Sequence, residues 1–364
     1  MNKSLLILPI AALALASCSD DEPLSTRQAT DEPISFRASM GNLSRATETT
    51  NANLASIYVT SFIGDETVPY FHDLKYDKAG DGFFTSTGEQ YVWPSDTTPL
   101  HFKSYAPSLD ELGADIEMNG TILTLMNFTP MEDISQQVDF ITAEATGTKA
   151  VNETAGVPLT FKHRLSQIEL RAKTDNTTYV YKIAGMRIGR PETTASFNFT
   201  TGEWTLDEWH DTYVYESACD TVTLGPTPVS VMGKSGNAML LPQTLTPWMP
   251  KGDPDNIARS AYLSVAVNIS TPEGVQIYPV PSDTRLDAAG HPRKFAWASV
   301  PLSGTWEQGK KYIYVLDFTT GGGYKDPDDP DPGKPVMGGP IKFTVDVQEW
   351  QNDSIPTPMT TPDA

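Results

Sequence analysis

Short segments in which apolar and polar residues alternate run through most of the chain. Examples are 34–40, 100–106 and 311–318, and many Val, Thr and Tyr residues stand in such segments. Alternation with a period of two is typical of a half-buried β-strand. The chain also has 29 prolines and 26 glycines, which favour tight turns, and it lacks long amphipathic helical patterns. The pattern therefore predicts an all-β protein built from β-sandwiches, with little helix.

The strand pattern divides the chain into two groups. A polar stretch at 144–155 follows the first group, and an apolar strand pattern resumes near residue 161. We therefore predict an N-terminal β-sandwich over 33–156 and a C-terminal β-sandwich over 157–364. Each is long enough to enclose an apolar core of its own.

The first 32 residues carry a different signal. Lys3 precedes an apolar run at 5–16, which as a helix would span about 18 Å and is too short to cross a bilayer. Small residues directly before Cys18 are what a lipoprotein signal peptidase requires. The sequence thus predicts a signal peptide over 1–17, cleavage between Ser17 and Cys18, a lipid on Cys18, and a flexible tether over 18–32. The alternative is an ordinary secretory signal with Cys18 as a chance neighbour.

The C-terminal end combines a Gly/Pro-rich segment with one more strand pattern. Residues 321–340 show no periodicity, which predicts an extended linker of at most about 65 Å. Beyond it, 341–350 alternates again, and its apolar face carries Ile341, Phe343, Val345 and Val347. Trp350 is out of phase, so we expect a bulge or the strand end near Glu349. So apolar a strand must join a sheet, either its own or that of another molecule.

Charge and candidate chemistry narrow the function. The chain has 26 Lys and Arg against 46 Asp and Glu, a net charge of −20, which argues against nucleic-acid binding. With Cys18 lipidated, Cys219 has no disulfide partner in the chain, and we expect it to be structural. The five histidines lie far apart, and no catalytic, metal-binding or phosphate-binding motif is present. The sequence predicts no enzyme, no metal site and no cofactor.

Several pieces of sequence, in this order and spacing, resemble the fimbrillin-like (Mfa-like) family of type V pilus lipoproteins of the Bacteroidota. The resemblance covers nearly the whole chain and implies two tandem transthyretin-like Greek-key β-sandwich domains after the lipoprotein signal peptide. The pieces that carry it are the lipobox at Cys18, Ile34–Phe36 leading to Ser44–Ala46, Tyr91–Pro94, Leu100–Tyr105, Phe161–His163, Gly304–Tyr312 and Gly338–Phe343.

The resemblance also implies a route of assembly. In polymerising members an Arg-specific protease cuts beyond the first strand, that strand leaves, and a strand of a neighbouring subunit fills the groove. Mapped here, the cleaved bond is Arg45-Ala46, the departing strand is 34–40 and the donor strand is 341–347. Two alternatives stay open. Arg45 is one arginine among many, and 341–347 can instead close its own sheet, as in an anchor or tip subunit.

The resemblance implies a fimbrial subunit or fimbria-associated surface lipoprotein that assembles by donor-strand addition and acts in adhesion. Its partners would be other pilin subunits, the outer membrane through the lipid on Cys18, and a host protein or glycan. It would be lipid-anchored at the outer membrane or cell surface. The acidic run 19–22 is similar to a surface-export signal, or is a solvated linker. The competing hypothesis is a monomeric surface glycan-binding lipoprotein.

Overall fold

The computed structural model describes residues 32–40, 49–50, 53–207, 214–286 and 293–350. In these ranges the regular secondary structure is almost entirely β-strand, which confirms the predicted all-β class. The helical elements there are α1 (Leu109–Leu112), α2 (Lys149–Asn152), α3 (Pro254–Arg259) and the 3-10 turn η1 (Ile134–Gln136). Across the described ranges, none of the helices has the length and apolar character needed to cross a bilayer.

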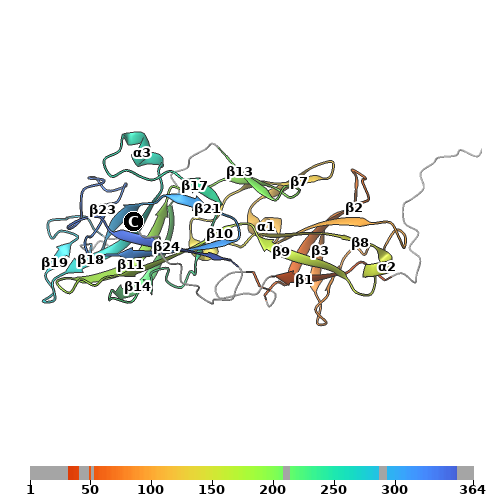
Figure 1. The fold of residues 1–364 in the computed structure, drawn as a ribbon, viewed down its shortest axis with the longest axis horizontal. Coiled ribbons are helices and arrows are strands. Elements are labelled where there is room, and N and C mark those ends of the chain that lie inside the picture. Colours follow the sequence, from red (N-terminus) through yellow and green to blue (C-terminus); the bar gives the residue numbers. More distant parts are fainter. Residues whose placement is uncertain (1–31, 41–48, 51–52, 208–213, 287–292, 351–364) are drawn as a thin grey trace, which may run out of the picture.

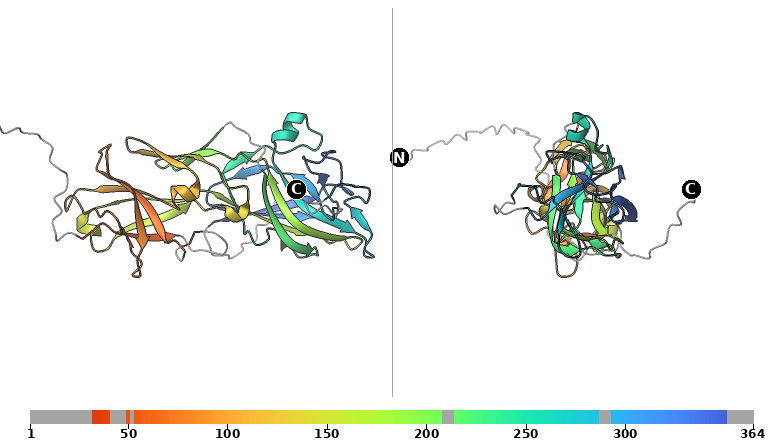
Figure 2. Two further views of the ribbon diagram at one scale, coloured as in Figure 1. Left: turned by 180° about the vertical axis from the view of Figure 1, so that it is seen from behind. Right: turned by 90° about the vertical axis from the view of Figure 1, so that its left-hand side faces the viewer.

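The molecule is elongated, with the N-terminal strands at one end and the C-terminal strands at the other (Figure 1). The end-on view in Figure 2 shows how narrow the cross-section is. Seven strands at the N-terminal end close into a barrel in the order β1-β4-β3-β2-β5-β8-β9. These strands are β1 (Phe36–Met40), β2 (Ser56–Ile63), β3 (Pro69–Lys78), β4 (Phe84–Thr85), β5 (Leu100–Ala106), β8 (Ile141–Gly147) and β9 (Val157–His163).

The C-terminal half has two sheets that share one large apolar core. The first sheet has the order β15-β10-β22-β24, and β16 also pairs with β10; the second has the order β14-β11-β18-β20-β23, and β19 pairs with β18. The first comprises β10 (Ser166–Lys173), β15 (Val229–Ser230), β16 (Ala238–Leu240), β22 (Lys310–Asp317) and β24 (Lys342–Glu349). The second comprises β11 (Val180–Gly189), β14 (Val214–Thr223), β18 (Tyr262–Ser270), β19 (Gln276–Tyr278), β20 (Ala296–Pro301) and β23 (Tyr324–Lys325).

A third group of strands joins the two halves. Its sheet has the order β13-β12-β7-β6, so strands from both halves pair in it. A separate apolar cluster lies there, containing Phe62 and Tyr105 from the barrel together with Phe197 and Trp350 from the C-terminal half. The remaining strands are β6 (Asp115–Asn119), β7 (Ile122–Phe128), β12 (Ala195–Asn198), β13 (Glu203–Leu206), β17 (Gln243–Leu245) and β21 (Gly304–Trp306). The expected transthyretin-like character of the two domains stays a prediction.

The structure moves the expected boundary between the two halves. We placed it near Gly156, yet β9 (157–163) belongs to the N-terminal barrel, where it pairs with β1 and β8. Val157, Leu159 and Phe161 face the barrel core, so their burial requires the N-terminal strands. The C-terminal half begins with β10 at Ser166, three residues beyond His163.

The Gly/Pro-rich segment 321–340 is not the extended linker that its composition predicts. Its Asp326 is 3% exposed and accepts hydrogen bonds from the hydroxyls of Ser264 (2.7 Å) and Ser299 (3.2 Å). Its glycines permit close packing: a β-carbon at Gly333 would lie 1.8 Å from the carbonyl oxygen of Pro250. The segment lies against the second sheet of its own half and contributes β23 to it.

Candidate strand-exchange site

β1 closes the barrel along a parallel seam. Residues 36–40 pair in parallel with 157–161 of β9, whereas β4 meets β1 only through Phe36 and Phe84. The apolar face predicted from the sequence points inward: Ile34, Phe36 and Met40 are buried, and Ala38 is partly buried. Parallel pairing is slightly less stable per residue than antiparallel pairing. β1 therefore joins the barrel through one long ladder, one short contact and its buried side chains.

Phe36 holds the centre of β1 in the barrel. Its ring is fully buried and meets the rings of Tyr76 and Phe102 edge to face, with centroids 4.7 and 5.1 Å apart. Departure of β1 would leave an apolar groove beside β9, bounded by these two rings. An extended strand with bulky apolar residues at alternating positions has the shape required to fill it.

β24, the candidate donor strand, is paired within its own half. Residues 342–349 run antiparallel to 310–317 of β22, and β24 lies at the edge of the sheet. Ile341 is buried and Phe343 lies 5.9 Å from Tyr314, yet Val345 and Val347 are 45% and 44% exposed. The apolar face that we expected is therefore covered at its beginning and open to solvent farther along. The phase of Trp350 predicted a bulge or the strand end near Glu349, and the strand does end at Glu349.

The end of β24 docks at the junction between the two halves. Trp350 is 3% exposed, and its indole stacks on the imidazole of His163, with centroids 4.3 Å apart and an interplanar angle of 8°. Its amide donates to the carbonyl of Gly309 at 2.7 Å. The indole Nε1 is buried and has no hydrogen-bond partner within the described residues. An exposed ion pair between Lys310 and Glu349 adds little stability there.

His163 is anchored in turn by a buried carboxylate. Its Nδ1 donates to Oδ2 of Asp139 at 2.8 Å, and Asp139 is 2% exposed. The same oxygen accepts the backbone amide of Thr49 at 3.1 Å. Thr49 follows directly on 41–48, which contains Arg45. One carboxylate oxygen thus connects the chain beyond the predicted cleavage bond to the residue on which Trp350 stacks.

Sequence reasoning missed this junction. His163 entered only as part of the family resemblance, and neither Asp139 nor Trp350 was connected with it. One signal was available: Val157, Leu159, Phe161 and His163 all occupy the inward phase of β9, so a polar side chain stands where an apolar one is the rule. Such a side chain needs a buried partner, but sequence order does not identify Asp139 as that partner.

The described structure does not include every predicted site residue. Ser17, Cys18, Arg45 and Ala46 lie outside the described residues, so their roles stay predictions. Cys219 is partly buried, and burial raises the pKa of its thiol, as suits a structural cysteine rather than a reactive one.

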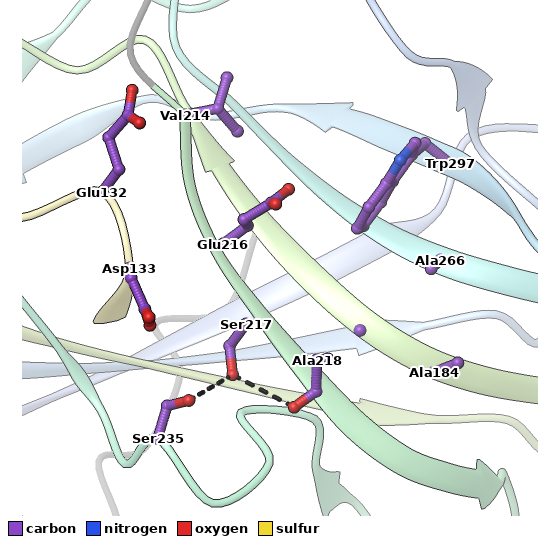
Figure 3. A pocket seen from close by; sticks show the side chains of 11 residues that line it. Glu132, Asp133, Ala184, Val214, Glu216, Ser217, Ala218, Ser235, Ala266 and Trp297 are labelled. Atoms are coloured by element: carbon purple, nitrogen blue, oxygen red, sulfur yellow. Dashed lines mark hydrogen bonds between the residues drawn. The ribbon is translucent and has the colours of Figure 1, made fainter. Parts of the chain in front are cut away.

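A cavity of about 610 Å³ lies on the outer face of the second C-terminal sheet (Figure 3). The strand register places Trp297, Ala266, Gly185 and Ala218 in one row across four strands, so three small residues beside Trp297 form its floor. Carboxylates line it, but Glu216 is paired with Arg187 at 2.9 Å. Within the part of the chain that the structure describes, no three His, Cys, Asp or Glu side chains are grouped to hold a metal ion.

With this architecture in place, comparison with known proteins identifies the class. A family model described as fimbrillin-like matches residues 44–350, so the chain belongs to the fimbrillin-like family. This confirms the resemblance and supports a fimbrial, cell-adhesion role at the cell surface. No curated protein matches the chain. The competing hypothesis of a monomeric glycan-binding lipoprotein gains no support.

The chain also aligns with several solved structures at low sequence identity. One is described as a cell adhesion protein of Bacteroides uniformis, with 17% identity, a TM-score of 0.46, and coverage of 89% of this chain and 100% of that chain. Another, from Bacteroides ovatus, is 15% identical with a TM-score of 0.48, and the match covers 89% of this chain and 99% of that chain. A fimbrilin of Porphyromonas gingivalis is 12% identical with a TM-score of 0.41, and the match covers 88% of this chain and 97% of that chain.

Proposed function

We propose that this protein is a non-catalytic fimbrial subunit that polymerises by donor-strand addition. In this proposal the chain is cut between Arg45 and Ala46, β1 leaves the barrel, and residues 341–347 of a second copy fill the vacated groove. The observation that carries the proposal is the position of β1. It is held by one parallel ladder to β9 and by a single residue pair with β4, so its departure breaks one long ladder and one short contact.

The two strands match in pattern. The segment 34–40, which contains β1, presents apolar residues at the four alternating positions 34, 36, 38 and 40. The segment 341–347, which overlaps β24, does so at 341, 343, 345 and 347. A strand that replaces β1 beside β9 would recover the backbone hydrogen bonds and bury its alternate side chains. Val345 and Val347 keep almost half of their surface exposed in their own sheet, so they gain burial by moving into the groove.

Donation requires more than the release of β24. Because segment 321–340 is packed against the second sheet, part of it must detach before the strand can reach a neighbour. Buried hydrogen bonds to Asp326 oppose this step. We therefore expect the intact subunit to remain a monomer and to polymerise slowly even after cleavage.

The experiment is limited cleavage of purified residues 19–364 with an Arg-specific protease, followed by intact-mass measurement and size-exclusion chromatography. We expect loss of everything up to Arg45, together with oligomers that grow with time. Arg45→Gln is the matched control and should stay monomeric. A cut product that remains a stable monomer would refute polymerisation by this route and would favour an anchor or tip role.

The membrane attachment belongs to the same proposal. Residues 1–17 would be removed, and Cys18 would carry the lipid that holds the subunit at the outer membrane before assembly. The support is the lipobox sequence itself. Labelled palmitate should be incorporated into the wild type but not into Cys18→Ala, and equal labelling of both proteins would contradict this assignment.

A further inference from the structure

We infer that His163 and Asp139 form a latch that couples cleavage near Arg45 to the release of β24. This inference rests on the proposed function and deepens it, because it assigns the trigger that frees the donor strand. Both side chains are positioning residues. Asp139 holds His163, and His163 provides the surface on which the end of β24 is docked.

The latch connects Thr49, near the start of the barrel, to Trp350 at the end of β24. The Thr49 amide and His163 Nδ1 both donate to Oδ2 of Asp139, at 3.1 and 2.8 Å. The imidazole of His163, held by Asp139, stacks in turn on the indole of Trp350. Residues far apart in the chain thus meet within two hydrogen bonds and one ring contact, and all but Thr49 are more than nine-tenths buried.

Cleavage acts on this chain of contacts in two ways. A cut after Arg45 makes Thr49 the fourth residue of the new chain, and residues near an end are readily lost from their contacts. Departure of β1 also removes the partner of residues 157–161, so β9 keeps only its pairs with β8 near His163. Both changes loosen the imidazole against which Trp350 is packed.

The end of β24 is suited to release. The Nε1 of Trp350 is buried without a partner in the described residues, so leaving the junction lets it bind water. Along the outer part of β24, the side chains of Val345 and Val347 are exposed, and Glu349 makes only an exposed ion pair with Lys310, so these side chains contribute little to holding the strand. Beside the backbone ladder to β22 and the apolar cluster at the junction, the stack on His163 is therefore a side-chain contact that holds this end of β24 in place.

The test measures the opening of β24 before and after a cut that does not depend on Arg45. A recognition sequence for a site-specific protease is inserted between Arg45 and Ala46 of the full mature chain. Hydrogen exchange of the peptide 342–350 is then followed by mass spectrometry in the monomer fraction. In the wild type we expect the cut to speed exchange by about tenfold or more, as loss of a hydrogen bond to a buried carboxylate implies.

Variants separate the latch from general loosening. Trp350→Leu and Asp139→Asn should exchange faster before the cut and gain less than about twofold from it, since the coupling is already lost. Phe343→Leu is the matched control: it weakens β24 through Tyr314 at the other end, so it should retain the full response to the cut. Asp139→Asn keeps the shape of the side chain, so a folded variant is available even if Trp350→Leu fails to fold.

The outcomes distinguish the inference from the proposed function. No change on cutting the wild type, or an equal increase in Trp350→Leu, overturns the latch. Polymers that form without faster exchange of 342–350 leave the proposed function standing and remove the latch. Faster exchange without polymers supports the latch and counts against polymerisation.

Discussion

The substitution Phe36→Ala tests whether β1 is held mainly by its central side chain. Phe36 is fully buried and makes edge-to-face contacts with Tyr76 and Phe102. Truncation of a buried phenylalanine to alanine costs about 3–5 kcal/mol, and the two aromatic pairs place this site toward the upper end of that range. The substitution should lower the stability of the N-terminal barrel, because Phe36 packs in its core.

The assay is urea unfolding followed by circular dichroism, with hydrogen exchange to locate the change. We expect the free energy of unfolding of the barrel to fall by about 4 kcal/mol and exchange to rise in β1 and β9. Ser39→Ala is the matched control in the same strand, because Ser39 is exposed and should cost less than about 0.5 kcal/mol. If Phe36→Ala costs less than about 1 kcal/mol, β1 is held by its backbone ladder instead, and our account of the groove is wrong.

Three further outcomes follow from the structure. Asp326→Ala should lower the free energy of unfolding of the C-terminal half by about 1–3 kcal/mol and speed exchange across 324–340, because two buried hydroxyls lose their acceptor; the exposed Asp331→Ala should do neither. Hydrogen bonds from Arg285 lower the pKa of Asp283 to about 2, so their stabilising effect is full above about pH 4 and is lost as the pH falls through 2. An NMR titration should show this pKa rising toward 4 in Arg285→Gln, and an unchanged value would contradict the assignment. The double variant Val345→Thr, Val347→Thr should leave monomer stability within about 0.5 kcal/mol by urea unfolding, since both side chains are largely exposed, yet it should slow polymer growth in the cleavage assay.

The local alternation of apolar and polar residues was sufficient to predict the two strands on which the proposed assembly depends. Alternation at 34–40 and 341–347 predicted β1 and β24, because side-chain direction in a strand depends only on the parity of the position. The phase of Trp350 predicted the end of β24 for the same reason. Family resemblance then connected the two strands, which alternation alone does not do.

The errors arose where long-range contacts decide the structure. Segment 321–340 has the composition of a linker, but Asp326 finds two serines some 30 to 60 residues earlier in the chain, and no local rule identifies them. Its glycines allow close approach rather than mobility. Likewise β9 was assigned to the wrong half because its partner β1 lies at the other end of the barrel sequence.

The position of β1 also has a consequence for how the protein folds. Ser39 is opposite Thr160, 121 residues later, so the seam forms only after the chain between them has been brought together. Contacts of such sequence separation form late, because their loop-closure entropy must be offset by structure already present. β1 should therefore be the last strand of the barrel to dock during folding. A strand that arrives last onto an otherwise assembled sheet is also the one that can be exchanged without refolding the rest.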